Sequence, residues 1–297
     1  MSDSHGHEHG DTSSRKLGAV SGINLVGFVV ELLGGIMFGS VALMSDAFHM
    51  LFDATAYLMA FFSAYKAERR GDGSDWSFGL HRLETLSAFF NGALLLLMAG
   101  YILWESYQRF LNPVEIGVVP TIVIGTGGLL VNLFSVYYLQ DSEKSLNEKG
   151  AFYHLLGDAG GSIAVVTSAL VIHFTGFYAA DPITAVLIAG LVVWSALKVL
   201  RGSTRILLQK SPVDTEDVED QITEIEEVHG VKDIRIWSLC SQIVIASLHI
   251  CDNSENLEES NRKKNKIREI LRDSGVDHST IEMEKHGDDN CSHEVKH

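Results

Sequence analysis

Long uncharged stretches constrain this chain more than any other feature. No Asp, Glu, Lys or Arg occurs over residues 85–104 (20 residues), 116–140 (25 residues) or 159–180 (22 residues). A helix rises 1.5 Å per residue, so about 20 residues cross the hydrocarbon core of a bilayer. We therefore interpret these stretches as membrane-spanning helices.

The hydrophobic pattern of the first two thirds predicts six spans. Asp181 and Pro182 supply an N-cap acid and a first-turn proline for the last span. Lys and Arg favour the cytoplasmic side, and they gather at the span ends shared with both termini, whereas the opposite ends hold only Arg109. Both termini are thus expected in the cytoplasm. The spans are expected at about 17–38, 41–65, 83–107, 116–139, 151–175 and 182–200.

After Pro212 the pattern becomes that of a small soluble domain. The periodicity predicts a helix over 216–228, strands over 231–239 and 242–251, a helix over 257–273 and a strand over 279–284. This α-β-β-α-β order fits a ferredoxin-like or metallochaperone-like α+β domain. The expected domains are a histidine-containing cytoplasmic arm (1–16), a six-helix transmembrane domain (17–205), a cytoplasmic α+β dimerisation and regulatory domain (206–285) and a flexible tail (286–297).

The net charge of −15 is concentrated after Ser211. Such an acidic balance argues against nucleic acid as a partner. Cys240, Cys251 and Cys291 all lie in this acidic part, and three cysteines cannot form a complete disulfide framework. We expect them to be reduced thiols in the cytosol.

A short pattern that occurs twice suggests the function. His49 and Asp53 stand four residues apart within one apolar span, and His154 and Asp158 repeat this spacing in another. On a helix each pair occupies one face, about one turn apart. Two such helices facing each other would offer two imidazoles and two carboxylates to one cation, a ligand set that suits tetrahedral zinc.

These acids are costly where they stand. Inserting a carboxylate near the bilayer centre costs on the order of 3 kcal/mol. Asp53 and Asp158 are therefore expected to have a function that offsets this cost. Asp46 and Glu31 add to this cost, and Asp46 shares a helix face with His49 and Asp53. The alternative is that each His only hydrogen-bonds its own Asp as a structural pair, which the repetition in two spans disfavours.

The chain resembles the cation diffusion facilitators, the zinc transporters also called solute carrier family 30. The resemblance lies in residues 43–49 (LMSDAFH) with Asp53, in the segment 77–84 (SFGLHRLE) and in the His154–Asp158 pair. The Pro212 junction and the strand residues 236–239 extend the resemblance over nearly the whole chain. It implies a homodimer that exports zinc in exchange for protons, with His49, Asp53, His154 and Asp158 as the transport site.

Further metal ligands are expected outside the membrane. His5, His7 and His9 either collect cytosolic zinc for the bundle or belong to an arm with incidental affinity. The resemblance implies a cytoplasmic zinc site, and its candidate ligands in this chain are His249, His278, Glu284 and Cys291. The resemblance also shows a departure: Arg235 stands where relatives often have histidine. This removes one candidate ligand, which argues against a full two-metal cluster and leaves a single regulatory ion open.

Gating residues are expected at the cytoplasmic mouth. The resemblance implies that Arg82 and Glu84 form an ion pair that helps to close the inward gate. Asp46, one turn before His49, is the third gating candidate.

The function expected from the sequence is a zinc/proton antiporter that lowers cytosolic zinc, with cadmium and cobalt as further substrates. Its partners are metal ions, protons, membrane lipid and a second copy of the chain. The short loops favour a plasma (inner) membrane, with an organelle membrane as the alternative. Two other functions stay open, a membrane zinc sensor or storage protein without flux and a metal-dependent intramembrane enzyme. The closed four-ligand set argues against the enzyme.

Overall fold

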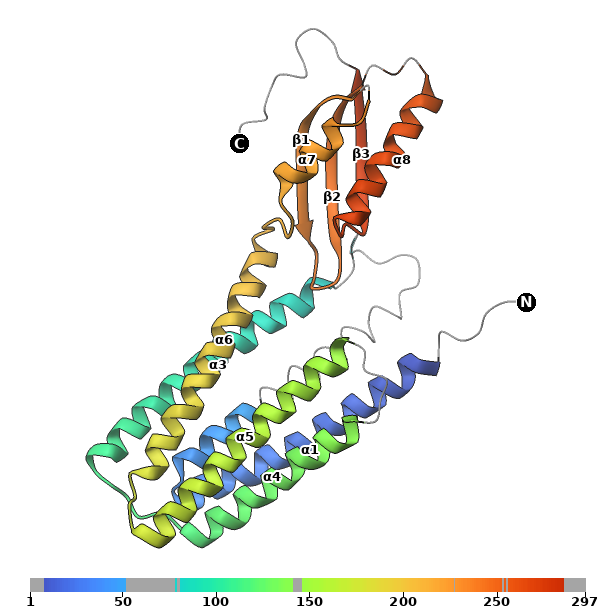
Figure 1. The fold of residues 1–297 in the computed structure, drawn as a ribbon. Coiled ribbons are helices and arrows are strands. Elements are labelled where there is room, and N and C mark those ends of the chain that lie inside the picture. The colour runs from blue at the N-terminus through green and yellow to red at the C-terminus, as the bar shows by residue number, and fades with distance from the viewer. Residues whose placement is uncertain are drawn as a thin grey trace. The chain divides into compact units, whose positions relative to one another are not determined.

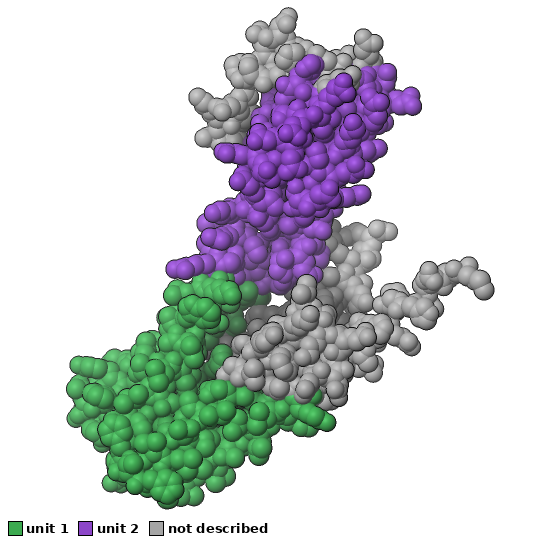
Figure 2. All heavy atoms as spheres, viewed as in Figure 1, with its two compact units in different colours: residues 1–73, 87–200 green, residues 74–86, 201–297 purple. Residues whose placement is uncertain are grey.

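A computed structural model describes residues 8–51, 78, 81–140, 146–226, 228–252, 254 and 256–285 of the chain. The chain divides into two compact units (Figure 2). Residues 1–73 and 87–200 form the first unit, and residues 74–86 and 201–297 form the second.

Apolar helices make up the first part of the chain (Figure 1). Within the described residues three helical segments are long and apolar enough to cross a membrane, namely α3, α6 and the Asp158–Thr175 part of α5. Three shorter apolar helices accompany them, Gly22–Phe38, Val41–Leu51 and Val118–Phe134. The prediction of a helical membrane domain is confirmed. The helices are α1 (Glu8–Phe38), the Val41–Leu51 helix, α3 (His81–Leu111), α4 (Val118–Gln140), α5 (Leu146–Thr175) and α6 (Ala180–Leu207).

The first helix begins before the predicted start of the first span. Residues 1–16 were expected to form an arm before that span, and α1 begins within this segment, at Glu8. The bounds of the arm stay a prediction. Ser, Thr and Lys are tolerated in a helix that extends beyond the bilayer, so the end of the apolar run at Leu17 does not end the helix.

The Val41–Leu51 helix lies at the centre of the first unit. Its residues Val41, Ala42 and Leu43 are fully buried. They belong to a core that also contains Ala99 of α3 and Ala189 of α6. Small residues allow helix backbones to approach closely in a membrane, where apolar burial against lipid gives little driving force. This packing fixes the helix that carries His49.

A buried carboxylate ties this helix to α6. Asp181 is 2% exposed, and its Oδ1 accepts a hydrogen bond from the Ser40 hydroxyl at 2.5 Å while its Oδ2 accepts one from the Val41 backbone N–H at 2.8 Å. Ser40 in turn accepts from the Leu43 N–H at 3.1 Å, as an N-cap does. Asp181 was predicted to cap its own helix, and this is wrong, because α6 already begins at Ala180 and the side chain caps a neighbouring helix instead.

The replacement Asp181→Ala is expected to destabilise the first unit by about 2 kcal/mol, because it removes the acceptor of a buried hydroxyl and of a helix N-terminal amide. A thermal unfolding scan of the purified full-length protein should show a midpoint lower by roughly 5 °C. Glu115→Ala, which alters an exposed acid, is the control. Equal midpoints for the two variants would contradict this assignment.

The second unit contains a three-stranded sheet in the order β1-β2-β3. β1 pairs antiparallel with β2, and β2 pairs parallel with β3. The helices α7 and α8 share one apolar core with the sheet, in which Ile222, Leu248 and Ile267 are buried (Figure 1). The elements are α7 (Thr215–Thr223), β1 (Val228–Ser238), β2 (Val244–Asp252), α8 (Leu257–Asp273) and β3 (His278–Lys285).

The predicted α-β-β-α-β order is confirmed, and the helix predicted over 257–273 has the bounds of α8. The first helix is shorter than expected. It ends at Thr223, and Val228 joins β1, where it pairs with Asp252. Cross-strand pairing therefore takes precedence over the helical periodicity that extends to residue 228.

The cysteines of the second unit differ in state. Cys240 is a free and buried thiol, whereas Cys251 is disulfide-bonded. The expectation of reduced thiols is therefore wrong for Cys251. Cys291 lies outside the described residues.

Candidate metal site

His49 and Asp158 meet inside the first unit. The His49 Nε2 atom lies 3.1 Å from Asp158 Oδ1, and the two side chains are 21% and 2% exposed. His49 comes from the Val41–Leu51 helix and Asp158 from α5, so residues 109 positions apart face each other. The packing of the Val41–Leu51 helix at the centre of the bundle produces this approach.

The separation suits a shared metal ion. Zinc lies about 2.0–2.1 Å from its nitrogen and oxygen ligands, so neighbouring ligand atoms of a tetrahedral site are roughly 3.3 Å apart. The His49–Asp158 distance of 3.1 Å is close to this value. The other two expected ligands cannot be compared, since Asp53 and the side chain of His154 lie outside the described residues. The backbone of His154 lies in α5, one turn before Asp158.

A chain of buried polar groups lies beside the pair. Asn132 of α4 donates to the Ser162 hydroxyl at 3.1 Å, and Ser162 donates to Asp46 Oδ2 at 2.8 Å. All three side chains are fully buried. Ser162 is one turn after Asp158 on α5, and Asp46 is one turn before His49, so these hydrogen bonds link the two helices that carry the pair. The sequence predicted a gating role for Asp46, which stays a prediction.

Glycine makes this approach possible. A Cβ added at Gly161 would lie 2.8 Å from Asp46 Oδ1, which is closer than real Cβ contacts allow. At the preceding Gly160 an added Cβ would meet nothing within 4 Å. Gly161 therefore sets the distance between α5 and the Val41–Leu51 helix.

Gly161→Ala should displace the Asp46 carboxylate and widen the separation between His49 and Asp158. Overpacking of this kind costs roughly 1–3 kcal/mol, so we expect roughly tenfold weaker metal binding. Gly160→Ala, with an identical change in composition, should bind within about twofold of the parent. Isothermal titration of zinc into the purified proteins measures both, and equal affinities for the two variants would contradict the proposed packing.

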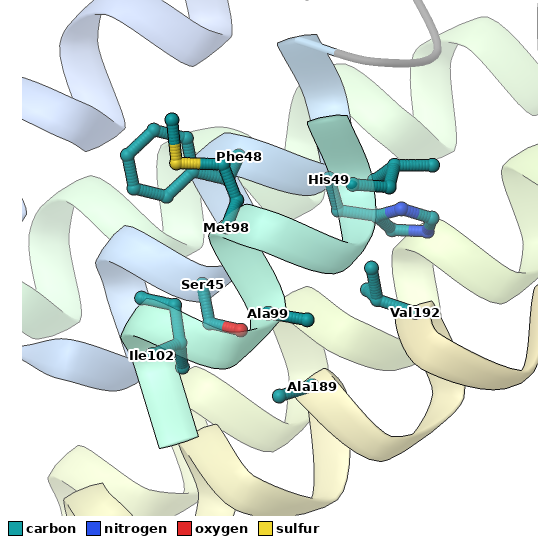
Figure 3. Close-up of a pocket in the computed structure, with 9 residues that line it drawn as sticks. Ser45, Phe48, His49, Met98, Ala99, Ile102, Ala189 and Val192 are labelled. Atoms are coloured by element: carbon teal, nitrogen blue, oxygen red, sulfur yellow. The ribbon is translucent and has the colours of Figure 1, made fainter. Parts of the chain in front are cut away.

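A small cavity of about 10 Å³, roughly the space of one water molecule, lies next to His49. Figure 3 shows Ser45 and His49 on one helix, with Ala99 of α3 and Ala189 and Val192 of α6 among the residues around them. Its wall is almost entirely apolar, and among its lining residues only His49 offers a nitrogen ligand. Among the described residues, the carboxylate that approaches His49 comes from α5, not from α3 or α6.

A second group of metal-ligating side chains lies on the sheet of the second unit. His249 Nδ1 is 3.0 Å from Glu284 Oε1 and 3.5 Å from Glu282 Oε2. One ligand atom from each of the three side chains lies within 4.8 Å of the others. Hydrogen bonds from Lys232 and His249 hold the pKa of Glu284 below its usual range, so the carboxylate is ionised and available to a cation.

The strand register explains this group. His249 on β2 pairs with Glu282 on β3, and Glu284 follows two residues later on the same face of the strand. Glu282 was missed because the parallel pairing of β2 and β3, which brings it opposite His249, cannot be read from the local sequence. His278, predicted as a ligand, pairs with Ile245 at the other end of β3 and does not join the group. Cys291 lies outside the described residues.

The expected ion pair between Arg82 and Glu84 does not form. Residues i and i+2 of a helix do not face each other, and Glu84 instead accepts a hydrogen bond from the Ser241 hydroxyl at 2.5 Å. Arg82 lines a cavity of the second unit together with Arg235 and Trp237. The Arg82–Glu84 pair is absent in this conformation, and a gating role for either residue stays a prediction.

The histidines of the N-terminal segment cannot be placed as a ligand group. His5 and His7 lie outside the described residues. His9 is part of α1, but its side chain is likewise not described. Their role in metal collection stays a prediction.

Comparison with known proteins places this geometry in a family. Residues 18–208 match the cation efflux transmembrane domain, and residues 211–286 match the cytoplasmic domain of cation efflux proteins. These two matches cover both units.

Similar full-length proteins occur in several bacteria. The chain is 33% identical over 295 residues to the cadmium, cobalt and zinc/H⁺-K⁺ antiporter of Bacillus subtilis (strain 168), covering 96% of this chain and 94% of that protein. It is 34% identical over 299 residues to the zinc transporter ZitB of Escherichia coli (strain K12), covering 96% and 93%. It is also 34% identical over 288 residues to the metal cation efflux system protein CzcD of Cupriavidus metallidurans, covering 96% and 90%. With helices, cytoplasmic sheet and both family matches in agreement, this chain belongs to the cation diffusion facilitator family.

Proposed function

We propose that the protein is a zinc/proton antiporter that exports Zn²⁺ from the cytosol through an intramembrane site formed by His49, Asp53, His154 and Asp158. The observation that carries the proposal is the 3.1 Å approach of His49 Nε2 to Asp158 Oδ1. Two aspartates would neutralise the double charge of the ion in a medium that otherwise excludes it. Neutral imidazoles complete a ligand set that zinc accepts in tetrahedral geometry.

The metal preference follows from the nitrogen and oxygen ligands. Two imidazoles favour zinc over manganese and iron, which prefer sites richer in oxygen. Cadmium and cobalt are proposed as further substrates, in agreement with the name of the antiporter of Bacillus subtilis. The metal is the cargo of this site and is released on the other side of the membrane.

Proton coupling follows from the chemistry of metal binding. Ligands must be deprotonated to bind zinc, and histidine titrates near neutral pH, so protons and metal compete. If the site opens to each side in turn, protons entering down their gradient displace the metal outward. A sensor or storage protein would bind the metal without this alternation, and family membership argues for a transporter over an enzyme.

The test is zinc flux in proteoliposomes that contain the full-length protein and a zinc-sensitive dye. An imposed pH gradient should drive zinc accumulation, and an ionophore that collapses the gradient should abolish it. Protein-free vesicles are the control. Zinc binding without any flux would support the sensor or storage protein and overturn the antiporter.

The group of His249, Glu282 and Glu284 is proposed as a regulatory zinc site. Its donor set of one imidazole and two carboxylates fits zinc, and the atoms lie within 4.8 Å of one another. Arg235 of β1 is a cation and adds no ligand. One ion per chain is therefore proposed here instead of a two-metal cluster.

The number of zinc ions bound per chain tests whether His249, which belongs to the group on the sheet, or His278, which was predicted from the sequence, is a ligand. His249→Ala should lower the zinc bound per chain by about one equivalent, because the imidazole is the only nitrogen ligand among the three grouped side chains. His278→Ala should leave the stoichiometry unchanged. Atomic absorption after dialysis measures both, and the opposite pattern would restore His278 as the ligand.

The assembly and location follow the family. A homodimer joined through the cytoplasmic domain, residues 206–285, is proposed, together with a transmembrane domain over residues 17–205. The proposed orientation has both termini in the cytoplasm, which the distribution of Lys and Arg supports, and the proposed location is a plasma (inner) membrane.

A further inference from the structure

A buried acid of α1 takes no part in the metal site described above. Glu31 is 1% exposed, and among the described residues neither of its carboxylate oxygens has a hydrogen-bond partner. Asn24, two turns earlier on the same face of α1, is also 1% exposed and unpartnered in that part of the chain. Such groups are rare, because each buried polar group without a partner costs free energy.

The bundle makes room for this carboxyl group at one glycine. An added Cβ at Gly128 of α4 would overlap Glu31 Oε1. At Gly127, the preceding residue, an added Cβ would meet nothing within 4 Å. The Glu31 carboxyl therefore sits directly against the backbone of α4, in a space that only glycine leaves open.

The groups around Glu31 make an ionised carboxylate costly. Among the described residues, the charged group that acts on Glu31 is Asp46 of the Val41–Leu51 helix, which is also an acid. The α4 segment 118–134, which contains Gly128, has no ionisable residue. An unpaired carboxylate in such surroundings takes up a proton and becomes neutral.

We propose that Glu31 is a proton-carrying site of the transport cycle, separate from the metal ligands. In the conformation described here its carboxyl group is buried against α4 and holds the proton away from water. When this site opens to the cytosol, the O–H bond breaks and the proton passes to water, leaving the carboxylate. Protonation from the opposite side restores the neutral group.

The close packing against Gly128 favours a proton over a larger cation, which would need several oxygen ligands and space for its own volume. This inference rests on the proposed antiport. It adds Glu31 as a carrier of the exchanged proton, at a position separate from the histidines of the metal site.

The test compares Glu31→Gln with the parent in proteoliposomes. Glutamine keeps the shape of the side chain but cannot carry a proton. Zinc uptake driven by a pH gradient should fall at least tenfold, and the proton movement evoked by zinc, read with an internal pH dye, should fall with it. Zinc–zinc exchange at equal pH should stay within about twofold of the parent, because the metal ligands are untouched.

Each other outcome has a defined meaning. Unchanged gradient-driven uptake in Glu31→Gln overturns the inference, and so does the loss of exchange together with uptake in a variant that still binds zinc. Absence of any flux in the parent overturns the antiport instead. Glu115→Gln, an exposed acid, controls for the change of charge.

A second pair of variants applies if Glu31→Gln does not fold. Gly128→Ala should push the Glu31 carboxyl out of its space and lower gradient-driven uptake severalfold, whereas Gly127→Ala should not. Equal uptake by the two glycine variants overturns the inference.

Discussion

Asp158→Asn is expected to lower zinc transport by roughly 100-fold or more, since even groups that only support a metal ligand change affinity by 10–100-fold. Asparagine keeps the size of the side chain and its buried position on α5. It removes the negative charge that offsets half of the charge of the ion, and its amide is a poor zinc ligand. The loss should appear both in zinc binding by calorimetry and in proteoliposome uptake.

A matched control comes from the same helix. Ser168 is 4% exposed on α5, and its hydroxyl has no hydrogen-bond partner among the described residues. Ser168→Ala should therefore bind and transport zinc as the parent does. If Asp158→Asn kept more than a tenth of the parent uptake, Asp158 would not be a ligand of the transported ion.

The sequence predicted the membrane helices because the length of an apolar segment and the absence of charge within it, both local properties, decide whether it inserts into a membrane. The four-residue spacing of His49 and Asp53, and of His154 and Asp158, could likewise be read directly. The approach of His49 to Asp158 could not, because it depends on which helices pack together. Gly161 allows the two helices to approach closely, but nothing in the sequence distinguishes it from the neighbouring glycines.

Two residues illustrate what sequence reasoning cannot assign. Asp181 precedes a proline, which is a local helix-start signal, yet its carboxylate caps the Val41–Leu51 helix across the bundle. Glu282 lies in a strand of the second unit and becomes a candidate ligand only through pairing with β2. Both assignments depend on contacts between segments far apart in the sequence, whereas local patterns report only on neighbours.

The second large effect is expected in the cytoplasmic unit, from Lys263→Met. Lys263 is 3% exposed on α8, and its Nζ lies 2.7 Å from Oδ1 of Asp252, which is 4% exposed. Methionine fills the same volume but leaves Asp252 buried without its cation. Breaking a buried ion pair from one side costs about 3–5 kcal/mol. Amide hydrogen exchange of β2 in the full-length protein should become roughly 100-fold faster.

The pH dependence of this effect tests its cause. Burial alone would raise the pKa of Asp252, but hydrogen bonds from Lys263 and Ser254 outweigh it and hold the pKa below its usual range. A lowered folded-state pKa adds stability above the unfolded value of about 4, and this stability is lost as pH falls below it. In Lys263→Met the depression weakens and burial opposes the charge, so the stability lost on acidification should be smaller than in the parent. Lys266→Met, an exposed neighbour on α8, should follow the parent, and a parallel pH profile for Lys263→Met would exclude the ion pair as the cause.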